Sequence, residues 1–385
     1  MKKVLFITPY YTPNTVGGAE ISTQLIAEGF PNESVVLTGS RCERERTLND
    51  VIIIERARKL LVGGWSKTLS NTAYSALDTI YLNILNIIPI RKWVKDYEQL
   101  ISSNNIGVIV CNTNVDALGR MSLWRAAYQK KVPIILVLRD PMLLRKKLFG
   151  LDMGWLFRCV IRNQLHYIKC FSAPSQYMID LYSSKGLRKN DNYVIPNAVD
   201  IAFATPLYDK RQNTIIYAGS IRTEKGILTL LKACEAQIFQ TPDMILKLFG
   251  RGDLEELCKG KHYVMLSEWV QRDELYNEMK KAKVVVLPAE YPEAFGRVLV
   301  EAVANGTLVV GSDAGGIPEI LDNDERYMFQ AKSVEGLSKC IKRIMALSPE
   351  DYVSEVMELQ NRFKRYSYEC YVKNWKGLLY KFLNP

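Results

Sequence analysis

Short runs of consecutive apolar residues, separated by longer segments with helical periodicity, occur along the whole chain. The runs are rich in valine and isoleucine and contain few polar residues, which indicates strands covered on both faces, as in parallel sheets. In the first half the predicted strands are Val4–Ile7, Val35–Leu37, Val51–Ile54, Val108–Cys111, Ile134–Leu138 and Ile168–Ala173. In the second half they are Thr214–Tyr217, Ile245–Phe249, Tyr263–Leu266, Val284–Leu287 and Thr307–Val310. Strands that alternate with helices predict an α/β protein built from doubly wound, Rossmann-like units.

The alternation is interrupted once, near the middle of the chain. The segment 194–200 ends the first series, and a polar stretch at 209–213 precedes the next predicted strand. A chain of 385 residues is long for one domain and suits two domains of about 150–200 residues. We therefore expect an N-terminal domain over 1–200, a C-terminal domain over 201–365 and an amphipathic terminal helix over 366–385.

The charge is distributed unevenly between the two halves. Residues 1–200 contain 26 Lys and Arg against 16 Asp and Glu, whereas residues 201–385 contain 25 of each, so the net charge of +10 lies in the first half. A basic half suggests an anionic partner, such as a phosphorylated substrate, a membrane surface or nucleic acid. The alternative is a basic surface that serves solubility alone.

Cysteine and histidine usage argues against a metal centre and against a disulfide framework. The eight cysteines form no C-x-x-C pair, and neither His166 nor His262 lies at metal-ligand spacing from a cysteine. We therefore expect a cytoplasmic protein in a reducing compartment. The first apolar run is too short for a signal peptide, and no stretch approaches the ~20 apolar residues of a membrane span.

Two acidic residues mark the strongest candidate for chemistry, the segment Glu293-Ala294-Phe295-Gly296-Arg297-Val298-Leu299-Val300-Glu301. It follows a predicted strand and opens a helix. Glu301 lies among apolar helix residues, where a carboxylate needs a partner, and it could accept both hydrogen bonds of a ribose diol. Gly296 allows a ligand to approach the backbone, and the helix start offers free N–H groups to an anion. The alternative is that Glu293 caps the helix and Glu301 faces solvent or bonds a neighbouring lysine.

A basic loop follows the first strand of the same half. In Gly219-Ser220-Ile221-Arg222-Thr223-Glu224-Lys225-Gly226, Arg222 and Lys225 could hold a diphosphate. In open α/β sheets, ligands bind beyond the carboxyl ends of the strands, which is where this loop and the acidic segment both lie.

Four motifs of the second half are very similar in order and spacing to those of glycosyltransferase family 4, a group of retaining enzymes with the GT-B fold. They are Ser220-x-Arg222-x-x-Lys225-Gly226, Phe249-Gly250-x-Gly252, Glu293-x7-Glu301 with Phe295-Gly296, and Gly315-Gly316-x-x-Glu319. Gly17-Gly18-Ala19-Glu20 resembles the family's acceptor-side glycine loop. The resemblance implies two Rossmann-like domains that face a central cleft, and a last helix that packs back on the N-terminal domain.

The resemblance also implies roles for single residues. Arg222 and Lys225 would hold the donor diphosphate and stabilise the leaving group, Glu301 would bind the ribose, and Glu293 would contact the donor sugar. Val270 would contact the base through its backbone. The donor-binding set implied in this way is Gly17, Gly18, Arg139, Gly219, Arg222, Lys225, Val270, Glu293, Ala294, Phe295, Gly296, Leu299 and Glu301.

One stretch departs from the family pattern. Many members carry a histidine after the strand that corresponds to Ile134–Leu138, whereas this chain reads Leu138-Arg139-Asp140-Pro141. Asp140 could contact a sugar hydroxyl or the acceptor, which adds it to Arg222, Lys225 and Glu293 as a candidate catalytic residue. Arg139 could bind a phosphate. The alternative is that both residues only cap the strand.

The implied reaction is transfer of a hexose from a nucleoside diphosphate sugar, with retention at the anomeric carbon and without a bound metal. No carboxylate pair suited to double displacement is evident, so catalysis would consist mainly of positioning and charge stabilisation. The triplet Asp322-Asn323-Asp324 has the D-x-D form of a metal motif, and we interpret it as a turn.

Two segments of the basic half, 143–162 and 79–97, combine basic with bulky apolar or aromatic residues, as in proteins that bind anionic lipid headgroups. Core helices with a solvated basic face are the alternative. We expect a lipid-linked saccharide acceptor and peripheral association with the inner face of the cell membrane, in the synthesis of a surface polysaccharide such as O-antigen, lipopolysaccharide or capsule.

Three other functions remain as alternatives. A nucleotide-sugar epimerase shares the GT-B architecture but typically needs additional histidines and acidic residues. A nucleotide-sugar-binding protein without transfer activity is the second, supported by the missing histidine. Nucleic-acid binding is the third, although no nucleic-acid motif is present.

Overall fold

A computed structural model describes residues 2–13, 17–40, 43–57, 88–113, 118–141, 144, 147–148, 151–152, 154–209, 211–238 and 241–383. The chain forms two compact units. Unit 1 consists of Met1–Pro196 together with Tyr371–Pro385, and unit 2 consists of Asn197–Cys370.

Unit 1 is built on an eight-stranded sheet with the order β10-β9-β6-β5-β1-β2-β4-β3. The strands are β1 (Lys3–Thr8), β2 (Ser34–Ser40), β3 (Arg44–Leu48), β4 (Val51–Ala57), β5 (Ile106–Asn112), β6 (Ile134–Val137), β9 (Cys170–Ala173) and β10 (Asn192–Val194). A separate two-stranded sheet pairs β7 (Lys147–Leu148) with β8 (Leu151–Asp152). In the large sheet every neighbouring pair is parallel except β3 with β4. The switch in strand order lies between β1 and β5.

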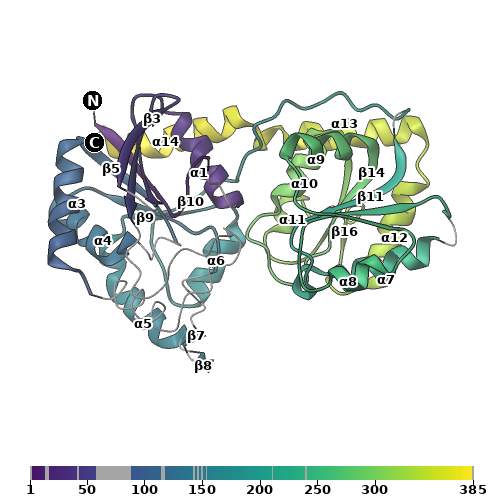
Figure 1. Cartoon of the computed structure of the whole chain (residues 1–385), viewed down its shortest axis with the longest axis horizontal. Coiled ribbons are helices and arrows are strands. Elements are labelled where there is room, and N and C mark those ends of the chain that lie inside the picture. Colours follow the sequence, from purple (N-terminus) through teal and green to yellow (C-terminus); the bar gives the residue numbers. More distant parts are fainter. Residues whose placement is uncertain are drawn as a thin grey trace. The chain divides into compact units, whose positions relative to one another are not determined.

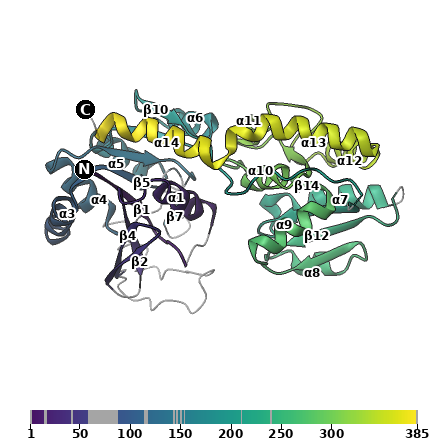
Figure 2. The same cartoon turned by 90° about the horizontal axis from the view of Figure 1, so that it is seen from above.

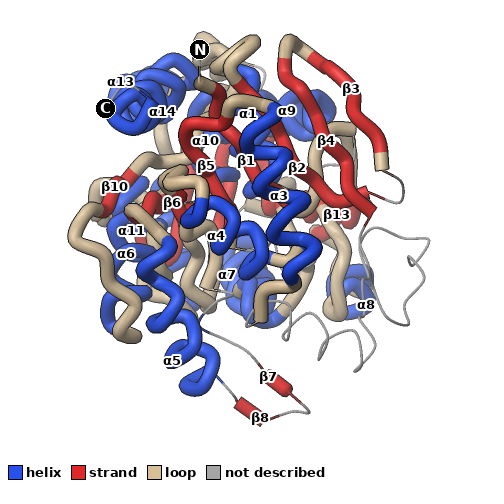
Figure 3. The backbone as a smooth tube through the Cα atoms, turned by 90° about the vertical axis from the view of Figure 1, so that its left-hand side faces the viewer, coloured by secondary structure: helices blue, strands red, loops and turns tan. Residues whose placement is uncertain are grey.

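The apolar pattern did not predict β3, the edge strand in Figure 3. Its residues are polar except Leu48, which is exposed, and ion pairs join it to β4: Arg44 and Arg46 lie 2.7 and 2.8 Å from the carboxylate of Glu55. The hydrogen bond from Arg44 has the largest effect on the pKa of Glu55 and lowers it. Burial acts in the opposite direction, but a further hydrogen bond from Arg46 helps to bring the pKa down to about 2. The ion pairs therefore hold an edge strand that has no apolar face.

The helices of unit 1 flank this sheet. They are α1 (Gly18–Glu28), α3 (Arg91–Ser103), α4 (Arg120–Gln129), α5 (Gly154–Gln164), α6 (Gln176–Ser184) and, from Tyr371 on, α14 (Tyr368–Leu383). The Tyr371 hydroxyl donates to the Ser22 carbonyl of α1 at 3.2 Å, and the rings of Tyr380 and Phe30 meet edge to face. Figures 1 and 2 both show the N- and C-terminal ends of the chain beside each other in this unit.

Unit 2 has a six-stranded, fully parallel sheet in the order β13-β12-β11-β14-β15-β16. The strands are β11 (Gln212–Ala218), β12 (Ile245–Phe249), β13 (Val264–Ser267), β14 (Ala282–Leu287), β15 (Leu308–Ser312) and β16 (Met328–Phe329). This is the 3-2-1-4-5-6 order of dinucleotide-binding folds, and its switch point lies between β11 and β14.

Helices cover both faces of the unit 2 sheet. They are α7 (Ile227–Ile238), α8 (Glu255–Lys259), α9 (Arg272–Lys281), α10 (Arg297–Ala304), α11 (Ile317–Ile320), α12 (Val334–Met345) and α13 (Pro349–Phe363). Figure 1 shows α9 and α10 on one side of the sheet and α7 and α12 on the other. The central strands β14 and β15 are entirely buried, as their apolar composition predicts, whereas Met265 on the edge strand β13 is exposed.

Two doubly wound sheets, one fully parallel and one parallel except at β3, confirm the predicted α/β, Rossmann-like architecture. Every predicted strand overlaps an observed one. Within the described residues, no helix has the length and apolar character needed to cross a membrane.

Candidate functional site

The loops that follow β11 and β14 meet at the switch point of unit 2. The backbone amides of Glu290 and Tyr291 donate to the Glu224 carbonyl at 3.1 and 3.0 Å. Gly226 has a φ of +76°, and a Cβ at this position would lie 1.7 Å from the Pro288 carbonyl oxygen. Only glycine fits here, so Gly226 allows the basic loop and the acidic segment to share one edge of the sheet.

The loop after β12 packs against the same basic loop. A Cβ on Gly250 would lie 1.9 Å from the Gly219 carbonyl oxygen, and one on Gly252 would lie 2.0 Å from that of Ile221. The glycines that carried the family resemblance therefore serve close backbone packing, and this packing holds the strand-to-helix loop in place.

Lys225 and Glu293, 68 residues apart in the chain, form an ion pair of 2.5 Å between Nζ and Oε1. Their side chains are 28% and 22% exposed, so the pair remains accessible to a ligand. The Glu293 backbone is held by the glycine loop after β15: Gly316 donates to its carbonyl at 2.8 Å, and a Cβ on Gly315 would clash with that carbonyl. A cation and a carboxylate are thus placed together at the edge where the donor site is predicted.

A second ion pair lies just beyond Gly296, which precedes α10 with a φ of +107°. Arg297 Nε donates to Glu301 Oε1 at 2.7 Å, and the two side chains are only 13% and 12% exposed. Glu301 is therefore paired with a cation of its own helix. Sequence reasoning missed Arg297, although the i,i+4 spacing to Glu301 was visible.

The other predicted donor residues of unit 2 differ in accessibility. Arg222 is 57% exposed, and its guanidinium lies 3.8 Å from the Glu224 carboxylate. Val270 is half-buried in the loop before α9. The side chains of Phe295 and Leu299 belong to the hydrophobic core. The backbone amides of Leu299 and Gly219 already donate to the carbonyls of Gly296 and Phe249, at 3.0 and 2.9 Å. Trp269, beside Val270, is 64% exposed and was not predicted.

In unit 1, a buried hydrogen-bond chain joins α1 to the ends of two central strands. Asn112 donates to Thr23 at 3.0 Å, and Arg139 Nε donates to Asn112 Oδ1 at 3.0 Å. Arg139 is 9% exposed. Arg139 thus connects the ends of β5 and β6. Gly17 and Gly18 form the start of α1, the helix that carries Thr23.

Asp140 lies at the same edge of the unit 1 sheet. Thr113 donates to its Oδ2 at 3.0 Å, and Tyr182 donates to its carbonyl at 2.8 Å. Sequence reasoning did not select Asn112 or Thr113. Their position directly after a buried strand, which was the criterion used for the second half, would have identified them.

The D-x-D triplet forms a turn after α11 whose carboxylates are held by arginines. Arg362 contacts both Asp322 and Asp324, and Arg365 and Arg326 each contact one of them, at 2.7–3.0 Å. Burial favours a raised pKa for Asp324, but hydrogen bonds from Arg326 and Arg362 outweigh it and lower the pKa to about 2. Among the described residues, no group of three or more His, Cys, Asp or Glu side chains suits a metal ion.

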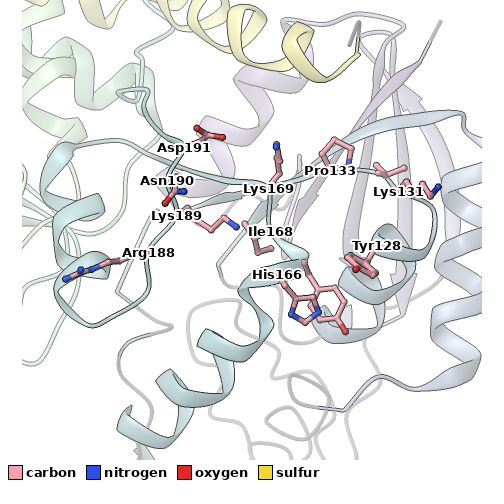
Figure 4. A pocket seen from close by; sticks show the side chains of 12 residues that line it. Tyr128, Lys131, Pro133, His166, Ile168, Lys169, Arg188, Lys189, Asn190 and Asp191 are labelled. Carbon is pink, nitrogen blue, oxygen red and sulfur yellow. The ribbon is translucent and has the colours of Figure 1, made fainter.

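A basic pocket of about 750 Å³ lies at the opposite edge of the unit 1 sheet. Figure 4 shows Lys131, Lys169 and Lys189 on the segments that enter β6, β9 and β10. Because these residues precede the strands, the pocket lies at their amino ends, away from Arg139 and Asp140. It accounts for part of the basic character of this half.

The C-terminal half matches a known protein family. Residues 200–369 match the family described as "Glycosyl transferases group 1". An uncharacterized 42.6 kDa protein in the cps region of Klebsiella pneumoniae is 25% identical over 338 residues, covering 82% of this chain and 87% of that protein. The phosphatidyl-myo-inositol mannosyltransferase of Mycolicibacterium smegmatis is 32% identical over 168 residues, which cover 40% of this chain and 43% of the enzyme.

Solved structures share the fold over nearly the whole chain. Sucrose-phosphate synthase from Thermosynechococcus elongatus matches with a TM-score of 0.76 and 18% identity, covering 99% of this chain and 98% of that one. Anabaena HepE, in complex with UDP and glucose, matches with a TM-score of 0.72 and 17% identity, covering 98% and 99%. The two doubly wound units therefore have the GT-B fold of these structures. The match of residues 200–369 to the glycosyl transferases group 1 family agrees with the resemblance to family 4.

Proposed function

We propose that this glycosyltransferase takes a hexose from a nucleoside diphosphate sugar and transfers it, with retention and without a metal ion, to a saccharide acceptor. The proposal rests on two ion pairs, Lys225–Glu293 and Arg297–Glu301, whose carboxylates lie on either side of Gly296 in the sequence. Lys225, with the exposed Arg222, would neutralise the diphosphate, and the two carboxylates would accept hydrogen bonds from sugar and ribose hydroxyls.

Two similar proteins favour a lipid-linked acceptor in surface polysaccharide synthesis. One is the Klebsiella protein, whose name places it in a cps region, and the other is named as a phosphatidyl-myo-inositol mannosyltransferase. HepE, which shares the fold, has been solved with UDP and with UDP-glucose. UDP-glucose is therefore a sensible first donor to test.

A panel of nucleotide sugars, screened by thermal unfolding, tests the donor proposal. A ligand that binds only the folded state at 100 times its Kd stabilises it by about 2.7 kcal/mol, which is a measurable rise in melting temperature. Incubation of the stabilising donor with and without acceptor glycans, followed by NMR, separates transfer from epimerisation and gives the anomeric configuration. The proposal fails if no nucleotide sugar stabilises the protein.

Removal of divalent metals is expected to leave transfer activity unchanged. The diphosphate charge would be met by Arg222 and Lys225, and the carboxylates of the D-x-D turn are already engaged by arginines. Initial rates with and without EDTA check this expectation. A loss of activity that Mg²⁺ or Mn²⁺ restores would contradict it.

The membrane part of the proposal depends on the basic half. Of the segment 79–97, the described part forms the start of α3, where Arg91 and Lys92 are exposed. Trp93 packs against Gly119 at the start of α4, so this ring is used within the fold. Residues 79–87 of that segment lie outside the described residues. So do Arg145, Lys146 and the side chain of Lys147 in the segment 143–162.

The protein is expected to pellet with anionic vesicles at low salt and much less with neutral ones. Basic residues near an anionic surface contribute about 1 kcal/mol each, and salt screens this attraction. Changing Arg145, Lys146 and Lys147 to glutamate should reduce pelleting, whereas the same reversal at the exposed Lys232, Lys280 and Lys339 of unit 2 should not. Equal recovery from neutral and anionic vesicles would contradict membrane binding and leave the transferase proposal intact.

A further inference from the structure

Polar atoms without hydrogen-bond partners gather around Glu301. Among the described residues, Arg297 Nη1 and Nη2 are buried and have no hydrogen-bond partner, whereas Arg297 Nε is bonded to Glu301 Oε1. Burial and then the nearby Glu301 carboxylate raise the pKa of Tyr276, and the charges of Arg272 and Arg297 oppose this rise. Arginine and tyrosine side chains from α9 and α10 therefore surround one carboxylate.

Such an arrangement is costly for stability alone. A buried guanidinium that leaves two nitrogens unbonded loses hydration without full compensation. An apolar residue at the first position of α10 would avoid this cost, because the neighbouring residues Leu299 and Val300 are already part of the core. The ion pair instead fixes one oxygen of Glu301, whose side chain is only 12% exposed.

We propose that Arg297 is a positioning residue that presents Glu301 to the ribose of the donor and thereby makes the site selective for ribonucleotides. Arg297 holds Oε1, so Oε2 remains as the oxygen that accepts from the ribose diol. A 2′-deoxyribonucleotide lacks the 2′-hydroxyl and therefore lacks one of the two hydrogen-bond donors of this diol. This inference rests on the proposed function, since it names the part of the donor that Glu301 recognises.

The test compares each nucleoside diphosphate with its 2′-deoxy counterpart by isothermal titration calorimetry on the full chain. The probes are UDP, GDP and ADP. The ribonucleotide that binds the wild type most tightly is then compared with its 2′-deoxy counterpart in every variant. We expect the wild type to prefer the ribonucleotide by about 10- to 100-fold, the range for one hydrogen bond to a charged group. Arg297→Met should reduce this preference to within about twofold, because a methionine cannot hold the carboxylate. Arg297→Lys, which keeps the charge, should retain most of it.

The control is Lys247→Met, which removes another partly buried ion pair of unit 2, to Glu278 at 2.6 Å with side chains 17% and 20% exposed. This variant should keep the wild-type preference even if its melting temperature falls. If Arg297→Met does not fold, Arg297→Gln replaces it in the comparison.

The inference is overturned if the methionine variant, or the glutamine variant in its place, discriminates as well as the wild type, or if the lysine variant discriminates no better than the neutral one. In both cases nucleotide binding itself continues and the proposed function stands. If no nucleoside diphosphate binds the wild type, the proposed function has failed first.

Discussion

Replacement of Lys225 by alanine is expected to lower kcat by about 100- to 1,000-fold, with a smaller change in KM for the donor. This is the range found when one preorganised group that stabilises developing charge is removed. Negative charge on the leaving diphosphate grows during transfer, so a cation beside it stabilises the transition state more than the bound substrate. The exposure of the Lys225–Glu293 pair, 28% and 22%, leaves Lys225 free to turn towards such a charge.

The alanine variant also leaves Glu293 without its cation, so the two effects must be separated. Glu293→Gln, alone and combined with Lys225→Ala, completes a double-mutant cycle measured by steady-state kinetics. If Lys225 acts on the leaving group, its removal lowers kcat in both backgrounds. A kcat within threefold of the wild type, or a loss that disappears in the Glu293→Gln background, would contradict the assigned role. Lys247→Met is the matched control for loss of a partly buried ion pair in the same unit.

Replacement of Glu301 by alanine is expected to raise KM for the donor by about 10- to 100-fold, with little change in kcat. Hydrogen bonds to a charged group contribute about 1.5–3 kcal/mol each, and contacts with the ribose are made equally in the ground and transition states. Arg222→Ala should act in the same direction, because its exposed guanidinium would bind the diphosphate before and during reaction.

Donor titrations at saturating acceptor check this prediction. Unchanged kinetic parameters for Glu301→Ala would remove the ribose assignment. Because Arg297 would lose its partner in this variant, melting temperatures are measured alongside, and Glu301→Gln serves as the milder replacement. A fall in kcat without a change in KM would also contradict the prediction, since it would give Glu301 a role in the transition state alone.

Several parts of the site were visible in the sequence because they depend on local spacing. The motif glycines, Arg222, Lys225 and the two carboxylates were selected from loops that follow apolar runs, and the structure places the basic loop and the acidic segment at one switch point. Arg297 could have been found by the same local reasoning, since it lies one helical turn before Glu301. Glu293 and Lys225 are 68 residues apart, and no local rule pairs them.

The sequence by itself determined the strands and the order of elements. A buried parallel strand must be apolar on both faces, so it appears in the sequence as a run of consecutive apolar residues. It could not reveal β3, whose polar residues are held by ion pairs with Glu55. Only the tertiary structure decided that β14 lies beside β11, that Arg139 is buried against Asn112, and that Glu301 is held by Arg297 rather than by a lysine. The physical reason is that strand order and side-chain pairing depend on which surfaces are buried together, and that choice is made by the packing of the whole domain.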